Sequence, residues 1–170
     1  MRKLVLLVVM VCSVGSLLTL PTGADDKTVN ATVTAKVISL SVNTNNLAYG
    51  SLGLGTQNNS PSPTNVLVAN TGTVAADFKI KGMVSSPAGW TLTAADPGAN
   101  IYRHRFDTSS GGSFNGVLST SSQALLNDVV MGGDAQIFFK LDMPTSTTSF
   151  TEQTLPIVIT ALESLASGPN

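Results

Sequence analysis

Residues 74–81, Val-Ala-Ala-Asp-Phe-Lys-Ile-Lys, decide the fold class of this chain. Apolar residues occupy every second position, and Asp or Lys stands between them in the second half of the stretch. Because successive side chains of a β-strand point to opposite faces, the pattern predicts a strand with one face in a core and one face in water.

Similar short runs occur on both sides of residues 74–81, separated by clusters of Gly, Pro and Asn. No window shows the sustained spacing of apolar residues that an amphipathic helix requires. The other expected strands lie at residues 47–54, 66–69, 90–92, 101–107, 117–118, 123–130, 136–143 and 155–162. Seven to nine strands at this spacing predict an all-β chain that folds as one immunoglobulin-like or jelly-roll-like β-sandwich domain.

A turn is expected at residues 70–73, Asn-Thr-Gly-Thr, directly before residues 74–81. It joins the run at residues 66–69 to the deciding strand. The two strands form either a hairpin or a connection between two sheets, and the sequence leaves both arrangements open.

The longest alternating run lies near the N-terminus and carries five apolar residues of one parity: Val29, Ala31, Val33, Ala35 and Val37. From Ile38 onward the apolar residues change parity, which predicts a β-bulge or a strand that changes sheets. The run is expected to form the first strand of the chain's own sandwich. The alternative is a donor strand that fills a groove in another subunit.

The first 24 residues have the features of a secretory signal peptide. Arg2 and Lys3 precede an apolar run at residues 4–20, and small residues follow it. We expect cleavage before Asp25, a β-sandwich domain over residues 25–165 and a flexible tail at residues 166–170. The expected location is extracellular or at the cell surface, with the periplasm as the alternative and no membrane contact after cleavage. An uncleaved membrane anchor is the competing interpretation.

Charge and cysteine content exclude several classes of function. With 9 basic and 10 acidic residues, the chain lacks the excess of positive charge that nucleic-acid binding requires. Cys12 is the only cysteine and lies in the expected signal peptide, so the mature chain is expected to have no disulfide, no thiolate metal site and no cysteine catalysis.

No combination of residues predicts an enzyme. The only histidine, His104, lies between Arg103 and Arg105, and it shares its parity with apolar strand positions. The acidic residues are scattered and no phosphate-loop, dinucleotide or nucleophile motif is present, so we expect no catalytic residues, no metal and no cofactor. A calcium site built from Asp96, Asn100 or Asp107 is the alternative.

Trp90 and Tyr102 are the candidate ligand-facing aromatic residues, because they would stack on a sugar if they were exposed together. The favoured interpretation places Trp90 between the sheets as a core residue. The loops at residues 58–65, 85–90 and 108–116 would supply the rest of a glycan site.

Residues 49–55, YGSLGLG, and residues 67–78, LVANTGTVAADF, resemble secreted immunoglobulin-like modules of prokaryotic surface proteins. The order of an N-terminal strand, a YG.L.LG segment and a V.NTGT...D segment is also similar to the fibre-forming group that includes camelysin and TasA. The resemblance implies an immunoglobulin-like fold and a surface location.

With the N-terminal run, these observations lead us to expect a secreted, non-catalytic structural protein of the cell surface or extracellular matrix. It would be a fibre subunit that assembles through its N-terminal strand, with further copies or other surface proteins as partners. The alternative function is an extracellular module that binds carbohydrate or another ligand.

Overall fold

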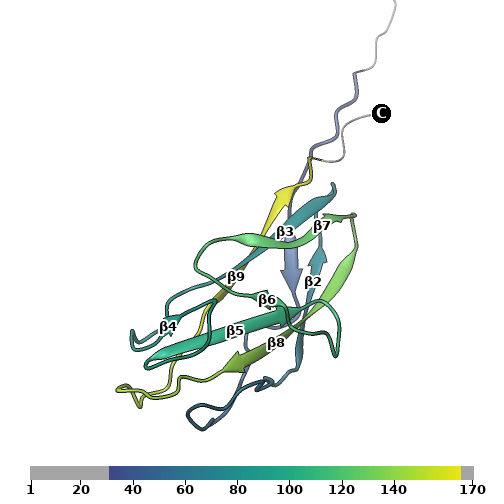
Figure 1. Cartoon of the computed structure of the whole chain (residues 1–170). Helices are drawn as coiled ribbons and strands as arrows, with labels where there is room; N and C mark the ends of the chain where they lie inside the picture. Colours follow the sequence, from purple (N-terminus) through teal and green to yellow (C-terminus); the bar gives the residue numbers. More distant parts are fainter. Residues whose placement is uncertain (1–30, 166–170) are drawn as a thin grey trace, which may run out of the picture. The chain divides into compact units, whose positions relative to one another are not determined.

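The computed structural model describes residues 31–165, which form nine β-strands and no helix (Figure 1). No helix able to span a membrane is therefore present among these residues. In chain order the strands are β1 (Leu40–Val42), β2 (Asn65–Asn70), β3 (Ala76–Gly82), β4 (Thr91–Leu92), β5 (Ile101–Asp107), β6 (Gly116–Val117), β7 (Gln123–Val129), β8 (Asp134–Asp142) and β9 (Ile157–Glu163). The expected signal peptide and tail lie outside the described residues.

The chain divides into two units, residues 1–34 and residues 35–170, and all nine strands belong to the second unit. In the first unit, residues 31–34 are exposed and form no strand. Val33, at 96% exposure, is almost fully in water.

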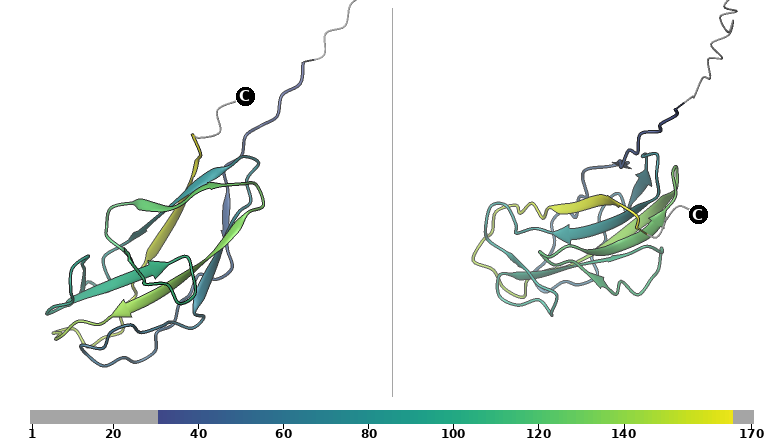
Figure 2. Two further views of the ribbon diagram at one scale, coloured as in Figure 1. Left: turned by 45° about the vertical axis from the view of Figure 1, so that its right-hand side comes forward. Right: turned by 90° about the horizontal axis from the view of Figure 1, so that it is seen from above.

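The strands form two sheets, which confirms the predicted all-β, sandwich-like class. The larger sheet has the order β1-β2-β8-β5-β4, with β6 also paired to β5, and the smaller sheet has the order β7-β3-β9. The sheets form two layers (Figure 2). The core between them contains buried side chains from both sheets: Val66, Val68, Phe106, Ile137 and Phe139 from the larger and Ala76, Phe78 and Ile80 from the smaller.

The deciding strand of the sequence analysis is β3, at the centre of the smaller sheet. Its apolar residues of one parity, among them Phe78 and Ile80, are fully buried, whereas Lys79 faces water. Burial of one face and exposure of the other confirm the alternation that the sequence predicts.

The turn between β2 and β3 connects the two sheets, which settles the question that the sequence left open. Asn70 organises this turn from a buried position: its amide nitrogen donates to the carbonyls of Val74 and Val129, both at 2.8 Å, and its oxygen accepts from the Gly72 N–H. A Cβ at Gly72 would collide with the Val37 carbonyl, so the turn requires glycine.

Two expected strands differ from the structure. In the described part of the N-terminal run and its continuation, residues 31–42, only the three residues of β1 are paired in a sheet, and residues 31–38 are exposed. Residues 47–54 form a single β-bridge, between Ala48 and Ser62. Gly50 has a φ of 65°, a left-handed conformation that turns the chain and ends the extended path.

The upper end of the second unit, at the top of Figure 1, gathers the N-terminal residues 35–39, the turn after β2, the turn before β8 and the C-terminal end of β9. The Thr73 N–H donates to the Val37 carbonyl at 2.8 Å, and the Gly132 N–H donates to the Asn70 carbonyl at 3.0 Å. These bonds hold the N-terminal residues and the two turns together.

The lower end, opposite to it, gathers three loops at residues 50–56, 83–90 and 145–153. The Gly55 N–H donates to the Pro144 carbonyl at 2.8 Å, and the Ser86 N–H donates to the Thr154 carbonyl at 2.9 Å. Strand β9 therefore starts at the lower end and runs to the upper end.

Candidate functional site

A groove of about 1220 Å³ opens between β1 and β9, the edge strands of the two sheets. Both sheets contribute apolar side chains to its wall: Leu40, Val42, Val66, Leu141, Ile157 and Ile159. Its lining continues into the lower end through residues 147–156 and stops at Ile159 on β9. The groove therefore has apolar side chains from both sheets in its wall and extends to the loops of the lower end.

Within residues 31–165, strand β9 has one edge without a partner strand, and residues of β9 line this groove. Among the described residues it pairs with β3 on one side and with no strand on the other. The Met83 N–H donates to the Pro156 carbonyl at 3.0 Å, and the Ser164 N–H donates to the Ala75 carbonyl at 3.1 Å. These two bonds show that the even-numbered residues of β9 direct their backbone N–H and C=O groups toward β3.

Because hydrogen-bonded and non-hydrogen-bonded pairs alternate in an antiparallel ladder, the odd-numbered residues of β9 direct their N–H and C=O groups away from β3. These residues are Ile157, Ile159 and Ala161, and their side chains pack against the core. The edge thus offers backbone donors and acceptors above an apolar floor, which is what an added strand requires.

The four predicted donor residues that the structure describes, Ala31, Val33, Ala35 and Val37, lie outside the strands. Val29 is not among the described residues, and Ala31 and Val33 are exposed. Ala35 and Val37 lie at the upper end, where the carbonyl of Ala35 accepts from the Thr73 hydroxyl at 3.2 Å.

Lys36 adds an ion pair at the same place. Its Nζ lies 2.6 Å from Oε1 of Glu163, at the end of β9. The N-terminal run is thus held to the upper end at residues 35–39, while the groove is lined only by residues from Leu40 onward.

His104 lies deep in the wall of the groove, as its parity with the apolar residues of β5 predicts. Its Nε2 is 2.7 Å from the Tyr49 hydroxyl, and its ring packs on Phe139 with centroids 5.5 Å apart. Burial lowers the pKa of His104 to about 4, against the opposing effect of the Asp142 charge. Burial likewise raises the pKa of Tyr49. Both groups are therefore neutral near pH 7.

Trp90 and Tyr102 pack on each other, with ring centroids 6.3 Å apart, and do not form an exposed pair. Tyr102 is buried and donates its hydroxyl to the Met83 carbonyl at 3.2 Å; burial raises its pKa to about 12. Trp90 is half-buried in the groove wall and donates Nε1 to the Thr147 hydroxyl at 3.0 Å. Their contacts are those of packed residues.

Asp142 is a fully buried carboxylate on the outer face of the larger sheet. It accepts from Arg103 at 2.8 Å, from Arg105 at 3.0 Å and from the Asn58 N–H at 2.7 Å. Burial alone would raise the pKa of Asp142, but these three donors hold it below its usual value. The cluster fastens the loop around Asn58 to the sheet.

The three residues considered for calcium have separate partners. Asp96 pairs with Arg103 at 2.8 Å, Asn100 accepts from Thr147 and Asp107 shapes its own loop. Among residues 31–165 no group of three or more His, Cys, Asp or Glu side chains is placed to hold a metal ion.

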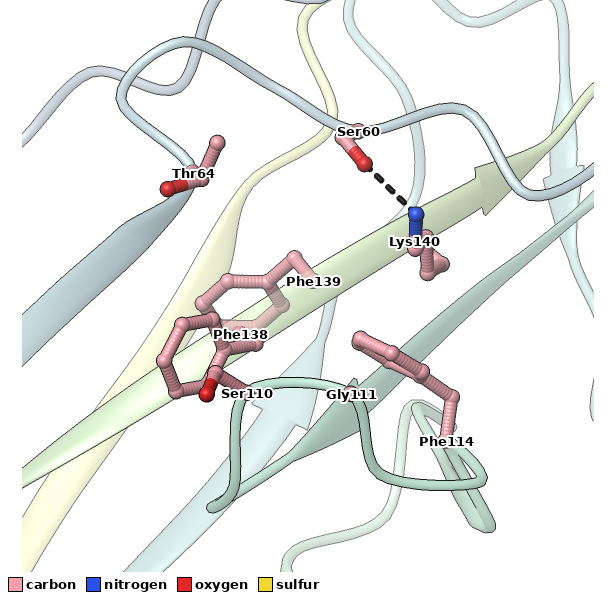
Figure 3. Close-up of a pocket in the computed structure, with 8 residues that line it drawn as sticks. All are labelled: Ser60, Thr64, Ser110, Gly111, Phe114, Phe138, Phe139 and Lys140. Atoms are coloured by element: carbon pink, nitrogen blue, oxygen red, sulfur yellow. Dashed lines mark hydrogen bonds between the residues drawn. The ribbon is translucent and has the colours of Figure 1, made fainter.

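A smaller pocket of about 280 Å³, the outer pocket, lies on the outer face of β8 (Figure 3). Lys140 donates to the Ser60 hydroxyl at 2.6 Å, and its Nζ lies 5.5 Å from the ring centroid of Phe114. Phe138 and Phe139 complete the apolar part of the lining.

Asp107 builds the loop that carries Phe114. Its carboxylate accepts from the N–H groups of Ser109 and Phe114, at 3.0 and 3.1 Å, and the Ser109 bonds are the main reason that the pKa of Asp107 is lowered. Phe114 has a φ of 50°, an unusual conformation for a bulky residue. Two of the three loops expected to supply a glycan site, residues 58–65 and 108–116, contribute to the lining of this pocket. The sequence does not indicate the contribution of β8 or the left-handed conformation of Phe114.

Comparison with known protein families, curated proteins and solved structures finds no match. The groove and the edge of β9 therefore carry the functional argument.

Proposed function

We propose that this protein is a secreted, non-catalytic structural subunit of the cell surface or extracellular matrix that assembles by strand addition. Of the N-terminal segment, residues 29–37, the part before Ala35 enters the groove of another copy and pairs with β9. The observation that supports this function best is the unpaired edge of β9 above an apolar groove.

The side chains of the N-terminal segment suit this groove. Val29, Ala31 and Val33 alternate with polar Asn30 and Thr32, so one face of the added strand is apolar and the other is polar. Stacked sheets lie about 10 Å apart, a gap that small aliphatic side chains fill. Moving one exposed Val side chain into such a groove contributes about 1.5–3 kcal/mol.

We infer that the sandwich is an immunoglobulin-like variant that lacks one strand on the side of the groove. The connection between sheets at residues 70–73 and the packing of the half-buried Trp90 against Tyr102 support this finer class. An added strand would fill the missing position. The signal-like first 24 residues and the resemblance to prokaryotic surface modules support the extracellular location.

The test compares two double variants of the protein that starts at Asp25. Ala31→Asp with Val33→Asp places charges on the apolar face of the segment, and Thr32→Asp with Thr34→Asp places the same charges on its polar face. Size exclusion and negative-stain electron microscopy should show filaments or oligomers for the parent and the Thr variant and only monomer for the Ala/Val variant. A parent that stays monomeric at every concentration contradicts the function.

A second candidate function is ligand binding at the outer pocket, and the unusual backbone of Phe114 favours it, because such conformations gather at binding sites. A phenylalanine ring beside an ammonium group suits an acidic sugar, with the ring against the sugar face and Lys140 near the carboxylate. Calorimetry with an acidic oligosaccharide should give binding that Lys140→Ala abolishes and that Lys79→Ala, on the other sheet, leaves unchanged. Equal heats for all three proteins would remove this candidate.

A further inference from the structure

Apart from Val42 in the groove wall, the large apolar side chains that remain exposed in the second unit lie at its two ends. The upper patch consists of Val37, Ile38, Val130, Met131, Leu162 and Leu165, and the lower patch consists of Leu54, Met83, Val84 and Phe150. Met131 is 66% exposed and Phe150 is 84% exposed. Single exposed apolar residues are ordinary, but groups of them mark interaction surfaces.

The two patches lie where the proposed exchange of strands begins and ends. The N-terminal segment leaves its own copy at the upper patch, where residues 35–37 are held by Thr73 and Glu163. The groove extends to the lower end, where Phe150 belongs to both the lining and the lower patch.

We propose that copies of this chain stack head to tail, with the lower patch of one copy on the upper patch of the next and the inserted segment antiparallel to β9. This inference rests on the proposed function and adds the direction and the end contact of the assembly. It yields an open filament, because a contact between two different surfaces of the same chain repeats without closing unless the rotation forms a ring.

The direction follows from the course of the chain. A segment that enters the groove from the lower end has its C-terminal part at that end and its N-terminal part deeper inside. Strand β9 runs from the lower end to the upper end, so the inserted segment runs opposite to it.

The odd-numbered residues at the free edge of β9 limit the register in which the inserted segment can pair with this strand. The free backbone groups of β9 belong to odd-numbered residues with inward side chains, so odd-numbered residues of the segment lie opposite them. Because residues 35–37 stay bound to their own copy, Val33 is the first inward residue past the junction. Ile157 is the first residue of β9 at the lower end, so Val33 lies opposite Ile157. In an antiparallel pair Ala31 then lies opposite Ile159.

The competing arrangement is a closed dimer in which two copies exchange segments through their upper ends. The segment would then run parallel to β9, with Val33 near Ala161. The head-to-tail arrangement is favoured because the lining of the groove extends to the lower end and stops at Ile159 on β9, and because this arrangement covers both patches, whereas the closed dimer leaves the lower patch in water.

Engineered disulfides distinguish the two arrangements, and the chain from Asp25 contains no other cysteine. Protein with Val33→Cys is mixed with protein carrying Ile157→Cys or Ala161→Cys and oxidised. Paired strand positions lie within the Cα separation that a disulfide accepts. We expect a cross-linked product between Val33→Cys and Ile157→Cys, and no cross-linked product between Val33→Cys and Ala161→Cys.

The outcomes of the cross-linking experiment test the head-to-tail arrangement and the proposed function separately. Cross-linking to Ala161→Cys, or to neither partner while filaments form, overturns the head-to-tail inference and leaves strand addition in place. Absence of any assembly in the parent overturns the proposed function itself.

The end contact has its own test. Phe150→Ser should raise the concentration at which filaments form about tenfold, whereas Lys79→Ser, on the outer face of β3, should not change it. Equal concentrations for Phe150→Ser and the parent overturn the end contact.

Discussion

The two sides of the sandwich use the same kinds of side chain and differ in what covers them. In the core, Phe78, Ile80 and Phe139 are almost completely buried between the two sheets. At the groove, Val42 in the edge strand β1 is 41% exposed, although the same two sheets form the walls. Strand β9 is part of the second wall, and beyond it the chain supplies no further strand among the described residues.

This difference in burial separates side chains that stabilise the subunit from side chains that are accessible to a partner. The side chains of the core are already buried, so they stabilise the subunit and are not accessible to a partner. The side chains of the groove are only partly buried, and in the proposed assembly an added strand would bury them further. Four predictions test this division by their effects on the free energy of unfolding of the monomer.

The largest effect is expected in the core. Phe78→Ala should lower the free energy of unfolding by about 3–5 kcal/mol, because it leaves a cavity at a fully buried site. Ile159→Ala, in the groove wall, should cost less than half as much in dilute monomer. Urea denaturation measures both, with Phe78→Leu as the milder control. Equal losses at the two sites would mean that the groove is as well packed as the core.

Acid should weaken the wall of the groove through His104. Its pKa in the unfolded chain is near 6.5 and in the fold about 4, so between these pH values the unfolded chain binds a proton that the folded chain does not. The free energy of unfolding should therefore fall by about 3 kcal/mol as the pH is lowered from 6.5 to 4.

The measurement is a series of urea denaturations from pH 7 to pH 4. His104→Gln cannot take up this proton and should flatten the pH dependence. Asp142, whose pKa is held below its usual value, should add a further loss only at lower pH. A parent whose stability is constant over the window would contradict a buried neutral histidine.

A smaller effect is expected at the upper end. Asn70→Ala removes the donors to the Val74 and Val129 carbonyls and the acceptor for the Gly72 N–H. Because these groups lose partners in a buried place, the free energy of unfolding should fall by about 2 kcal/mol. Thermal unfolding measures it, and Thr71→Ala, at an exposed position of the same turn, is the control. A harmless Asn70→Ala would show that the turn does not depend on this side chain.

The smallest effect on the monomer should accompany the loss of assembly. Val33→Ser changes an exposed side chain, so the free energy of unfolding should stay within about 0.5 kcal/mol of the parent, while filament formation decreases. The matched substitution Val68→Ser, at a fully buried position, should destabilise the monomer strongly. A Val33→Ser protein that still forms filaments at the parent concentration would separate the segment from assembly.

The sequence predicts the strands whose two faces lie in different surroundings. Strands β3, β5 and β8 follow the expected ranges closely, because each has an apolar face on the core and a polar face outside. For the same reason the inward position of His104 was predictable.

Alternation alone does not identify a partner strand. The sequence of residues 29–37 alternates as clearly as that of β3. In the described residues before Asn43, however, only Leu40–Val42 pairs with another strand. The groove is equally hidden in the sequence, because it results from the order of strands in two sheets. The outer pocket depends on the backbone of one residue, Phe114, which side-chain patterns do not report.

The unpaired edge of β9 also gives growth a direction. In a head-to-tail chain, one terminal subunit presents an empty groove and the other presents a free segment, so the two tips are chemically different. A short peptide with the sequence of residues 28–34 has a segment but no groove of its own. Such a peptide would occupy the open tip and terminate elongation there, while the opposite tip would remain competent.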